Sequence, residues 1–157
     1  MNTTSLPLYC SLVLLADDFE EVEAIVVLST LRQAGVCVKS VGLTGGFIRG
    51  AHGILVMPDL NMTDLSRSLD VKTVRLVMLP GDEYSLSRLG ADPRVHLLLR
   101  QVIDQGGLVA TGGSGIEMVR LALGYSESQQ FERQLIQWLP LSQSIETFSQ
   151  ELVRKLV

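Results

Sequence analysis

The chain has few clustered positive charges and no long apolar run. Its longest basic run is the pair Arg154-Lys155, and 13 Lys+Arg against 17 Asp+Glu give a net charge of −4. Phosphate binding needs clustered positive charge, so nucleic acid is not an expected partner. No stretch approaches the ~18 uninterrupted apolar residues that a membrane-spanning helix needs, so no membrane association is predicted.

Cysteine and histidine are equally scarce, with two of each. Cys10 and Cys37 fit neither a CxxC metal pair nor a disulfide framework. Both stand in apolar runs, so we expect reduced, buried thiols, which suit a cytoplasmic protein. His52 and His96 form no cluster of ligand spacing with cysteines or carboxylates. The sequence therefore predicts no metal and no cofactor.

The first 18 residues superficially resemble a secretory signal. They lack a basic residue in their first part, and the apolar run leads into a helix-start pattern. We interpret residues 8–16 as a strand buried on both faces of a parallel sheet, and expect no targeting segment.

Apolar residues are abundant, at 46% of 157 residues, which is enough to fill the core of one domain over residues 1–157. Strand and helix patterns alternate along the chain. Strands are expected over 8–16, 36–43, 53–57, 74–79 and 108–111. Helices are expected over about 20–34, 63–69, 83–89, 92–105, 114–123, 127–138 and 144–157. This alternation is typical of a doubly wound α/β sheet with helices on both faces.

Local signals mark several helix boundaries. Asp18 stands three residues before Glu21, an arrangement that resembles a capping box. Gly35 is expected to end that helix. Asp92-Pro93 forms an N-cap and first-turn pair for the helix over 92–105.

The segment LVATGGSG, residues 108–115, carries an apolar strand into paired glycines, Gly112 and Gly113, directly before a helix. Such a turn often displays a nucleophile in α/β enzymes. Ser114 is the hydroxyl at this turn, but Ile116 departs from G-x-S-x-G and no histidine base is evident. Ser114 is alternatively an N-cap, or part of an anion site built from backbone N–H groups.

Three loops are expected at the carboxyl ends of the strands, at residues 16–23, 80–84 and 112–115. With their flanking stretches 12–45, 52–59, 76–82 and 108–115, they resemble the ThiJ/PfpI superfamily. This class I glutamine amidotransferase-like group includes protein deglycases, chaperones and intracellular peptidases. The resemblance implies a flavodoxin-like three-layer α/β sandwich with a mostly parallel, doubly wound sheet.

The resemblance also implies roles for particular residues. The family's conserved acid falls on Glu23, which in active members lies beside the nucleophilic cysteine and shares a proton with it. The oxyanion loop falls on residues 80–82. The cysteine falls on Gly113, which has no side chain, and the next residue is Ser114.

Further departures separate the chain from active members. Asp82 replaces a glycine of the oxyanion loop. The part after the elbow helix is short, so we expect it to lack the later strand-bearing region that supplies a catalytic histidine in several branches. Taken alone, the sequence favours an exposed carboxylate at a helix start for Glu23, and it is the resemblance that favours a pocket-facing position. His52 is either a surface-turn residue or part of the pocket or dimer seam.

These observations predict a non-catalytic ThiJ/PfpI-like protein, a pseudoenzyme with a binding or regulatory role. One alternative is a hydrolase or deglycase using Glu23 with Ser114 or Asp82. Another is an adaptor acting through its dimer surface or C-terminal helix. The candidate catalytic residues are Glu23 and Ser114. The expected small-molecule site comprises Glu23, His52, Gly81, Asp82, Gly112, Gly113 and Ser114.

The helix over residues 22–31 is apolar nearly all the way round. An exposed helix does not carry two apolar faces. The resemblance adds that related folds dimerise through this helix. We therefore expect a homodimer in which its second face packs on another subunit.

Overall fold

The computed structural model describes residues 9–112, 115–124 and 129–157. Its strands are β1 (Cys10–Leu15), β2 (Val38–Gly42), β3 (Ile48–Arg49), β4 (Leu55–Val56), β5 (Leu60–Asn61), β6 (Val74–Leu79), β7 (Leu108–Gly112) and β8 (Leu135–Trp138). Its helices are α1 (Glu21–Gln33), α2 (Leu65–Ser68), α3 (Glu83–Gly90), α4 (Pro93–Asp104), α5 (Gly115–Leu123), α6 (Gln129–Gln134) and α7 (Ile145–Leu156), with a short 3-10 helix, η1 (Val71–Thr73).

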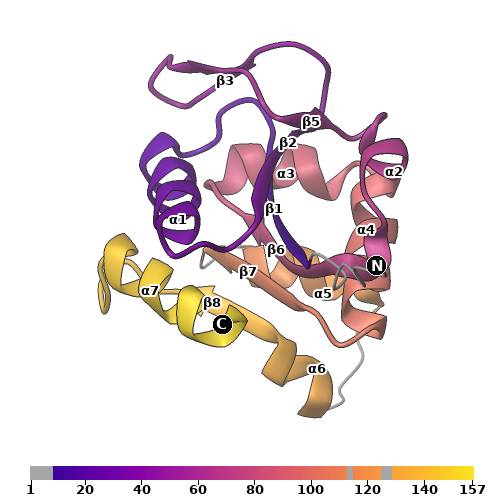
Figure 1. The fold of residues 1–157 in the computed structure, drawn as a ribbon. Coiled ribbons are helices and arrows are strands. Elements are labelled where there is room, and N and C mark those ends of the chain that lie inside the picture. The colour runs from indigo at the N-terminus through magenta and orange to yellow at the C-terminus, as the bar shows by residue number, and fades with distance from the viewer. Residues whose placement is uncertain (1–8, 113–114, 125–128) are drawn as a thin grey trace, which may run out of the picture.

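The central sheet has six strands in the order β5-β2-β1-β6-β7-β8 (Figure 1). Every pairing within it is parallel. Along the chain, β1, β2 and β5 are added toward one edge of the sheet, and β6, β7 and β8 are then added toward the opposite edge. The direction of strand addition therefore reverses between the neighbours β1 and β6. Ligands of doubly wound sheets bind at the carboxyl ends of the strands beside such a switch. The predicted doubly wound, flavodoxin-like fold is confirmed.

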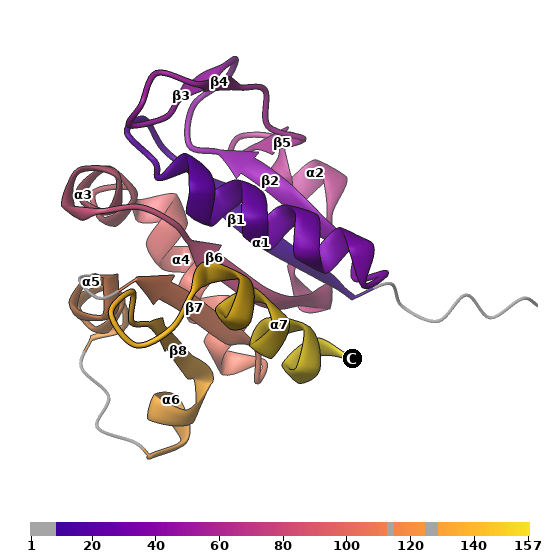
Figure 2. The ribbon, with the colours of Figure 1, turned by 90° about the vertical axis from the view of Figure 1, so that its left-hand side faces the viewer.

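Helices cover both faces of this sheet in three layers. One face carries α1 and α7, which lie in front of the sheet in Figure 2. The other carries α2, α3, α4 and α5. Alternate residues of β1 enter the two cores: Leu12 and Leu14 face α3 and α4, whereas Val13 and Leu15 face α1 and α7. Burial on both faces explains why β1 is apolar almost throughout.

Several predicted helix boundaries are confirmed. Asp92 caps α4 by accepting a hydrogen bond from the Arg94 N–H at 2.8 Å. Ser144 caps α7 in the same way. The helix over 20–34 is found as α1, with Gly35 just beyond its C-terminal cap. Within the described residues, none of the helices has both the length and the apolar character needed to cross a bilayer.

The expected capping box at the start of α1 is wrong. The N-cap is Glu20, whose side chain makes no capping hydrogen bond. Asp18 lies two residues earlier with a left-handed backbone, φ +71°, and its carboxylate pairs with Arg88 at 3.0 Å. The Glu21 carboxylate accepts hydrogen bonds from the His52 and Ile54 N–H groups of another loop instead of completing a capping box.

The expected third strand over 53–57 is also wrong in its placement. Only β4 forms there, and it pairs antiparallel with β3 outside the central sheet. The third parallel strand is β5, beside β2. The apolar side chains of Ile54, Leu55 and Met57 are exposed, so this run does not belong to the core.

The sequence predicts a helix over 127–138, but α6 ends at Gln134 and β8 follows, paired with β7. The buried Gln134 amide donates to the carbonyls of Ile103 and Gly107, both at 2.8 Å, which fixes the chain where helix changes to strand. The chain thus has a strand after the elbow helix, contrary to the expectation that it lacks a later strand-bearing region.

Candidate functional site

Glu23 and Gly81 meet at the point where the sheet topology switches. Glu23 stands in the first turn of α1, which follows β1, and Gly81 follows β6. The Gly81 backbone N–H donates to Glu23 Oε2 at 2.8 Å. The Glu23 side chain is buried, with the residue only 8% exposed. The exposed alternative for Glu23 is therefore wrong, and the structure brings two predicted site residues, Glu23 and Gly81, together.

Burial raises the pKa of Glu23 to about 7. The negative charges of Glu20 and Asp82 act in the same direction, while the hydrogen bond from Gly81 opposes the rise. A carboxyl group with this pKa is protonated in about half of the molecules at neutral pH. It can therefore donate a hydrogen bond or release a proton in the range where most carboxylates are fully ionised.

Gly81 is required at its position for two reasons. Its backbone has φ +124°, a conformation that side chains rarely tolerate. A Cβ there would also overlap the Ser85 hydroxyl, which stands within hydrogen-bond distance of the Pro80 and Asp82 carbonyls at 3.4 Å each. This packing holds the Gly81 N–H toward Glu23.

Asp82 is the N-cap of α3. Its carboxylate accepts a hydrogen bond from the Tyr84 N–H at 3.0 Å and thereby caps α3. Its side chain is exposed, and its charge reaches the site through the repulsion it exerts on Glu23. The carboxylate that replaces the family's glycine therefore serves the helix that follows.

Gly112, the last residue of β7, lies beside Gly81: a Cβ built on it would lie 3.7 Å from the Gly81 carbonyl oxygen. The turn between β7 and α5 thus begins next to the Glu23 site. Gly113 and Ser114 lie outside the described residues, so their predicted roles stay predictions.

His52 binds Glu21. Its ring Nδ1 lies 2.9 Å from Glu21 Oε1, and its backbone N–H donates to the same carboxylate at 2.9 Å. The Ile54 N–H adds a third donor at 3.3 Å. Glu21 also packs directly on Gly50, where any Cβ would overlap it. The His52 side chain is exposed, as expected of a surface turn, and its pKa is raised by the hydrogen bond and charge of Glu21.

Glu20, Glu21 and His52 are also the group in the described part of the chain with the composition of a metal site, since one ligand atom of each lies within 4.8 Å of the others. The hydrogen bonds already made to Glu21 account for the cluster without an ion. It lies at the start of α1, where carboxylates are favoured by the helix dipole.

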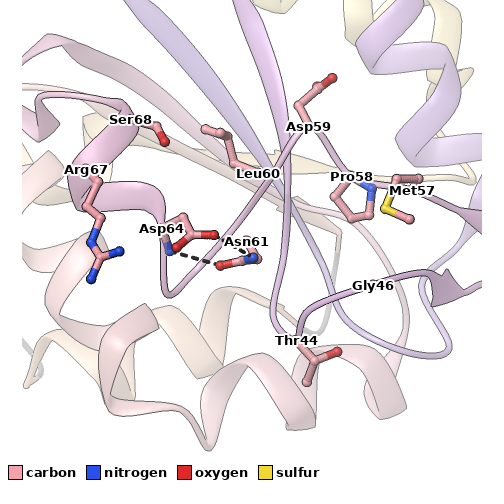
Figure 3. A pocket seen from close by; sticks show the side chains of 10 residues that line it. All are labelled: Thr44, Gly46, Met57, Pro58, Asp59, Leu60, Asn61, Asp64, Arg67 and Ser68. Atoms are coloured by element: carbon pink, nitrogen blue, oxygen red, sulfur yellow. Dashed lines mark hydrogen bonds between the residues drawn. The ribbon is translucent and has the colours of Figure 1, made fainter.

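A separate pocket of about 310 Å³ lies beside β5 (Figure 3). Its lining residues are Thr44, Gly46, Met57, Pro58, Asp59, Leu60, Asn61, Asp64, Arg67 and Ser68. Two of these lining residues, Asn61 and Asp64, bond to each other through two hydrogen bonds of 3.0 and 2.9 Å. This pocket shares no residue with the Glu23–Gly81 contact.

The sequence did not predict two structural contacts, that of Glu21 with His52 and that of Ser85 with Gly81. Glu21 is one of three glutamates at the start of α1, and nothing in their spacing marks which one a distant loop will bury. Ser85 follows Asp82 by three residues, a spacing that places it over the preceding turn. That spacing is the one available signal for its contact with Gly81.

Comparison with known proteins places this geometry in a family. A model described as the DJ-1/PfpI family matches residues 11–126. Protein dj-1beta of Drosophila melanogaster is 34% identical over 102 residues, which are 64% of this chain and 52% of that protein. Parkinson disease protein 7 homolog of Danio rerio is 28% identical over 101 residues, with the same two shares. The chain thus spans about half the length of these curated relatives.

Solved structures share the fold. Oxidised DJ-1 of Toxoplasma gondii superposes with a TM-score of 0.79 at 20% identity, covering 94% of this chain and 90% of that one. DJ-1beta of Drosophila melanogaster gives 0.75 at 22% identity, with the same coverage. At these identities the structural likeness shows the fold alone. The family model extends over most of the chain, and the chain therefore belongs to the DJ-1/PfpI family.

Proposed function

We propose that this protein binds a small molecule at the Glu23–Gly81 contact without the cysteine chemistry expected of active family members. The observation that carries the proposal is the retained, buried Glu23, hydrogen-bonded to the Gly81 N–H at 2.8 Å, in a chain with glycine where the family's nucleophile is expected. Gly113 has no side chain and cannot attack a substrate. Glu23 is still present in the chain, and binding of a ligand is a role that it can serve without the cysteine.

The charges around Glu23 define the class of ligand. Glu20 and Asp82 repel an anion, and the pKa of Glu23 at about 7 leaves a carboxyl proton available near neutral pH. A protonated carboxyl group donates one hydrogen bond, which suits a carbonyl oxygen. We therefore propose an uncharged carbonyl compound, an aldehyde, ketone or amide, as the ligand class.

The alternative enzyme role for Asp82 has less support, because its carboxylate is occupied in capping α3. Ser114 as a nucleophile rests on the sequence alone.

Ligand-observed NMR on the full chain tests the proposal. A panel of small aldehydes and amides is compared with the carboxylates of the same carbon skeletons, for the native protein and for Glu23→Ala. We expect the neutral compounds to bind the native protein below about pH 7, where Glu23 is protonated. The carboxylates should not bind, and the variant should lose binding of the neutral compounds.

The same samples measure chemistry. Turnover of an aldehyde or a glycated amine by the native protein that disappears in Glu23→Gln would overturn the non-catalytic part of the proposal. Glu146→Gln, an exposed glutamate on α7, is the matched control.

We also propose that the protein is a cytoplasmic homodimer. Most of the apolar circumference of α1 is already covered, by the sheet on one side and by α7 on another. Val22 and Ile25 remain 59% and 47% exposed on this helix. This smaller face supports association of two copies through α1, and the two free thiols suit a reducing compartment.

A further inference from the structure

The two cysteines lie side by side at the amino ends of neighbouring strands. Cys10 begins β1, and Cys37 directly precedes β2. Their sulfur atoms are 2.7 Å apart, and both are free thiols. The expectation of two buried thiols is wrong in one respect, because Cys37 is only half-buried whereas Cys10 is 2% exposed.

The backbone around this pair has the spacing that a disulfide requires. Ser11 pairs with Val38 in the parallel register of β1 and β2, and the Ser11 N–H donates to the Cys37 carbonyl at 2.8 Å. Neighbouring strands lie about 4.8 Å apart, within the roughly 4.4–6.8 Å between Cα atoms that disulfides span. With their sulfur atoms 2.7 Å apart, the two cysteines are within reach of each other across these strands.

The two thiols have unequal access to solvent, and Cys10 is a weak acid. Burial, followed by the hydrogen bond and charge of Cys37, raises the pKa of Cys10 to about 12, and the charge of Lys39 only partly opposes this. Cys10 thus keeps its proton at neutral pH. A dissolved oxidant reaches Cys37 first, because Cys37 is the more exposed of the two.

We propose that Cys10 and Cys37 form a reversible intramolecular disulfide when the protein meets a peroxide, at a site apart from the Glu23 contact. The Cys37 sulfur attacks one peroxide oxygen, the O–O bond breaks, and the other oxygen leaves as water, which yields a sulfenic acid on Cys37. The Cys10 sulfur then attacks the Cys37 sulfur, the S–O bond breaks, and the leaving hydroxide takes the Cys10 proton as a second water. Two thiols and one peroxide give one disulfide and two waters.

The bond would close a loop that contains the whole of α1, and with it Glu23. Cross-linking restricts the unfolded chain more than the folded one. For a loop of this length we expect the thermal midpoint to rise by roughly 5–10 °C on oxidation. Reduction should reverse the rise.

Peptide mapping of the full chain tests this directly. The reduced protein is treated with hydrogen peroxide, its remaining thiols are alkylated, and it is digested with trypsin. Cleavage after Arg32 and Lys39 separates the two cysteines. We expect the peptide ending at Arg32 joined to the peptide 33–39, lighter than their sum by two hydrogen atoms and separated again by dithiothreitol.

Two variants give the controls. In Cys10→Ser, Cys37 should proceed to sulfinic acid because no second thiol intercepts it. In Cys37→Ser, Cys10 should react at least about tenfold more slowly than Cys37 does in the native protein. Survival of both native thiols, over-oxidation of native Cys37 as fast as in Cys10→Ser, or a bond between two chains would each overturn the proposal. The native protein alone decides it if a variant fails to fold.

Discussion

The backbone nitrogen of Gly81 donates a hydrogen bond to Glu23 Oε2 at 2.8 Å, across 58 residues of sequence. The contact joins the loops that follow β1 and β6, the neighbouring strands at which the sheet topology switches. One oxygen of a buried acid is therefore positioned by backbone geometry. The contact depends on the positive φ of Gly81, +124°, which is a backbone conformation that favours glycine.

Replacing Glu23 by glutamine should change how stability depends on pH. Because the folded-state pKa is about 7 and the ordinary value is 4.5, the folded protein holds more protons than the unfolded chain between these values. Native stability therefore falls as pH rises through this interval, by roughly 3 kcal/mol in all. Glu23→Gln lacks this loss, so the stability difference between variant and native protein should shift in the variant's favour toward about pH 8. Urea unfolding at several pH values measures it, and a difference independent of pH would contradict the buried acid.

Replacing Gly81 by alanine should destabilise the fold by at least about 2 kcal/mol, through backbone strain and the clash with Ser85. Gly45→Ala is the matched control, because a Cβ at Gly45 has no atom within 4 Å. That change should cost less than about 0.5 kcal/mol. Equal unfolding midpoints for the two variants would mean that Gly81 is not held as described.

The His52–Glu21 pair should stabilise the protein within a window of pH. The pKa of His52 is raised by its hydrogen bond to Glu21, so the contribution of the charged ring is full below the ordinary value of 6.5 and is lost as pH rises through the folded-state value. Burial alone would raise the pKa of Glu21, but the hydrogen bonds from His52 and from backbone N–H groups hold it below 4.5. The contribution is therefore lost again as pH falls through the lowered Glu21 pKa.

NMR titration of the His52 ring checks this pairing. Its midpoint should be higher in the native protein than in Glu21→Gln, where the ring loses its charged acceptor. An unchanged midpoint would show that the two side chains do not interact in solution.

Association through α1 predicts different results for two similar variants. Ile25→Asp places a charge on the exposed face of α1 and should convert a dimer to a monomer in light scattering after size-exclusion chromatography. Leu97→Asp, at a residue 58% exposed on α4 across the sheet, should leave the dimer intact. A native protein that is monomeric at micromolar concentration would refute the homodimer.

The parts of the fold that could be predicted from sequence are those where one physical cause dominates. The apolar run of β1 indicates a strand that is buried on both faces, and Asp92-Pro93 indicates the start of a helix. The apolar run before Pro58 does not form the predicted strand of the central sheet, because its side chains are exposed on a two-stranded ribbon. The switch from α6 to β8 depends on the Gln134 amide reaching two distant carbonyls, which no local pattern encodes.

The site was predictable to a similar extent. Family motifs identified Glu23 and the loop at Gly81, and their contact is present. The roles of Glu21 and of the Cys10–Cys37 pair depend on which residues the fold brings together across 31 and 27 positions of sequence. Side-chain partners at such separations follow from strand order and register, which sequence patterns leave open.

We expect the buried carboxyl group of Glu23 to retain a proton near neutral pH. Carbon-13 NMR of glutamate carboxyl groups measures this directly, with Glu23→Gln used to assign the resonance. We expect a titration midpoint near 7. A midpoint near the ordinary value of 4.5 would contradict it, because Glu23 would then be an ordinary carboxylate with no proton to offer a ligand.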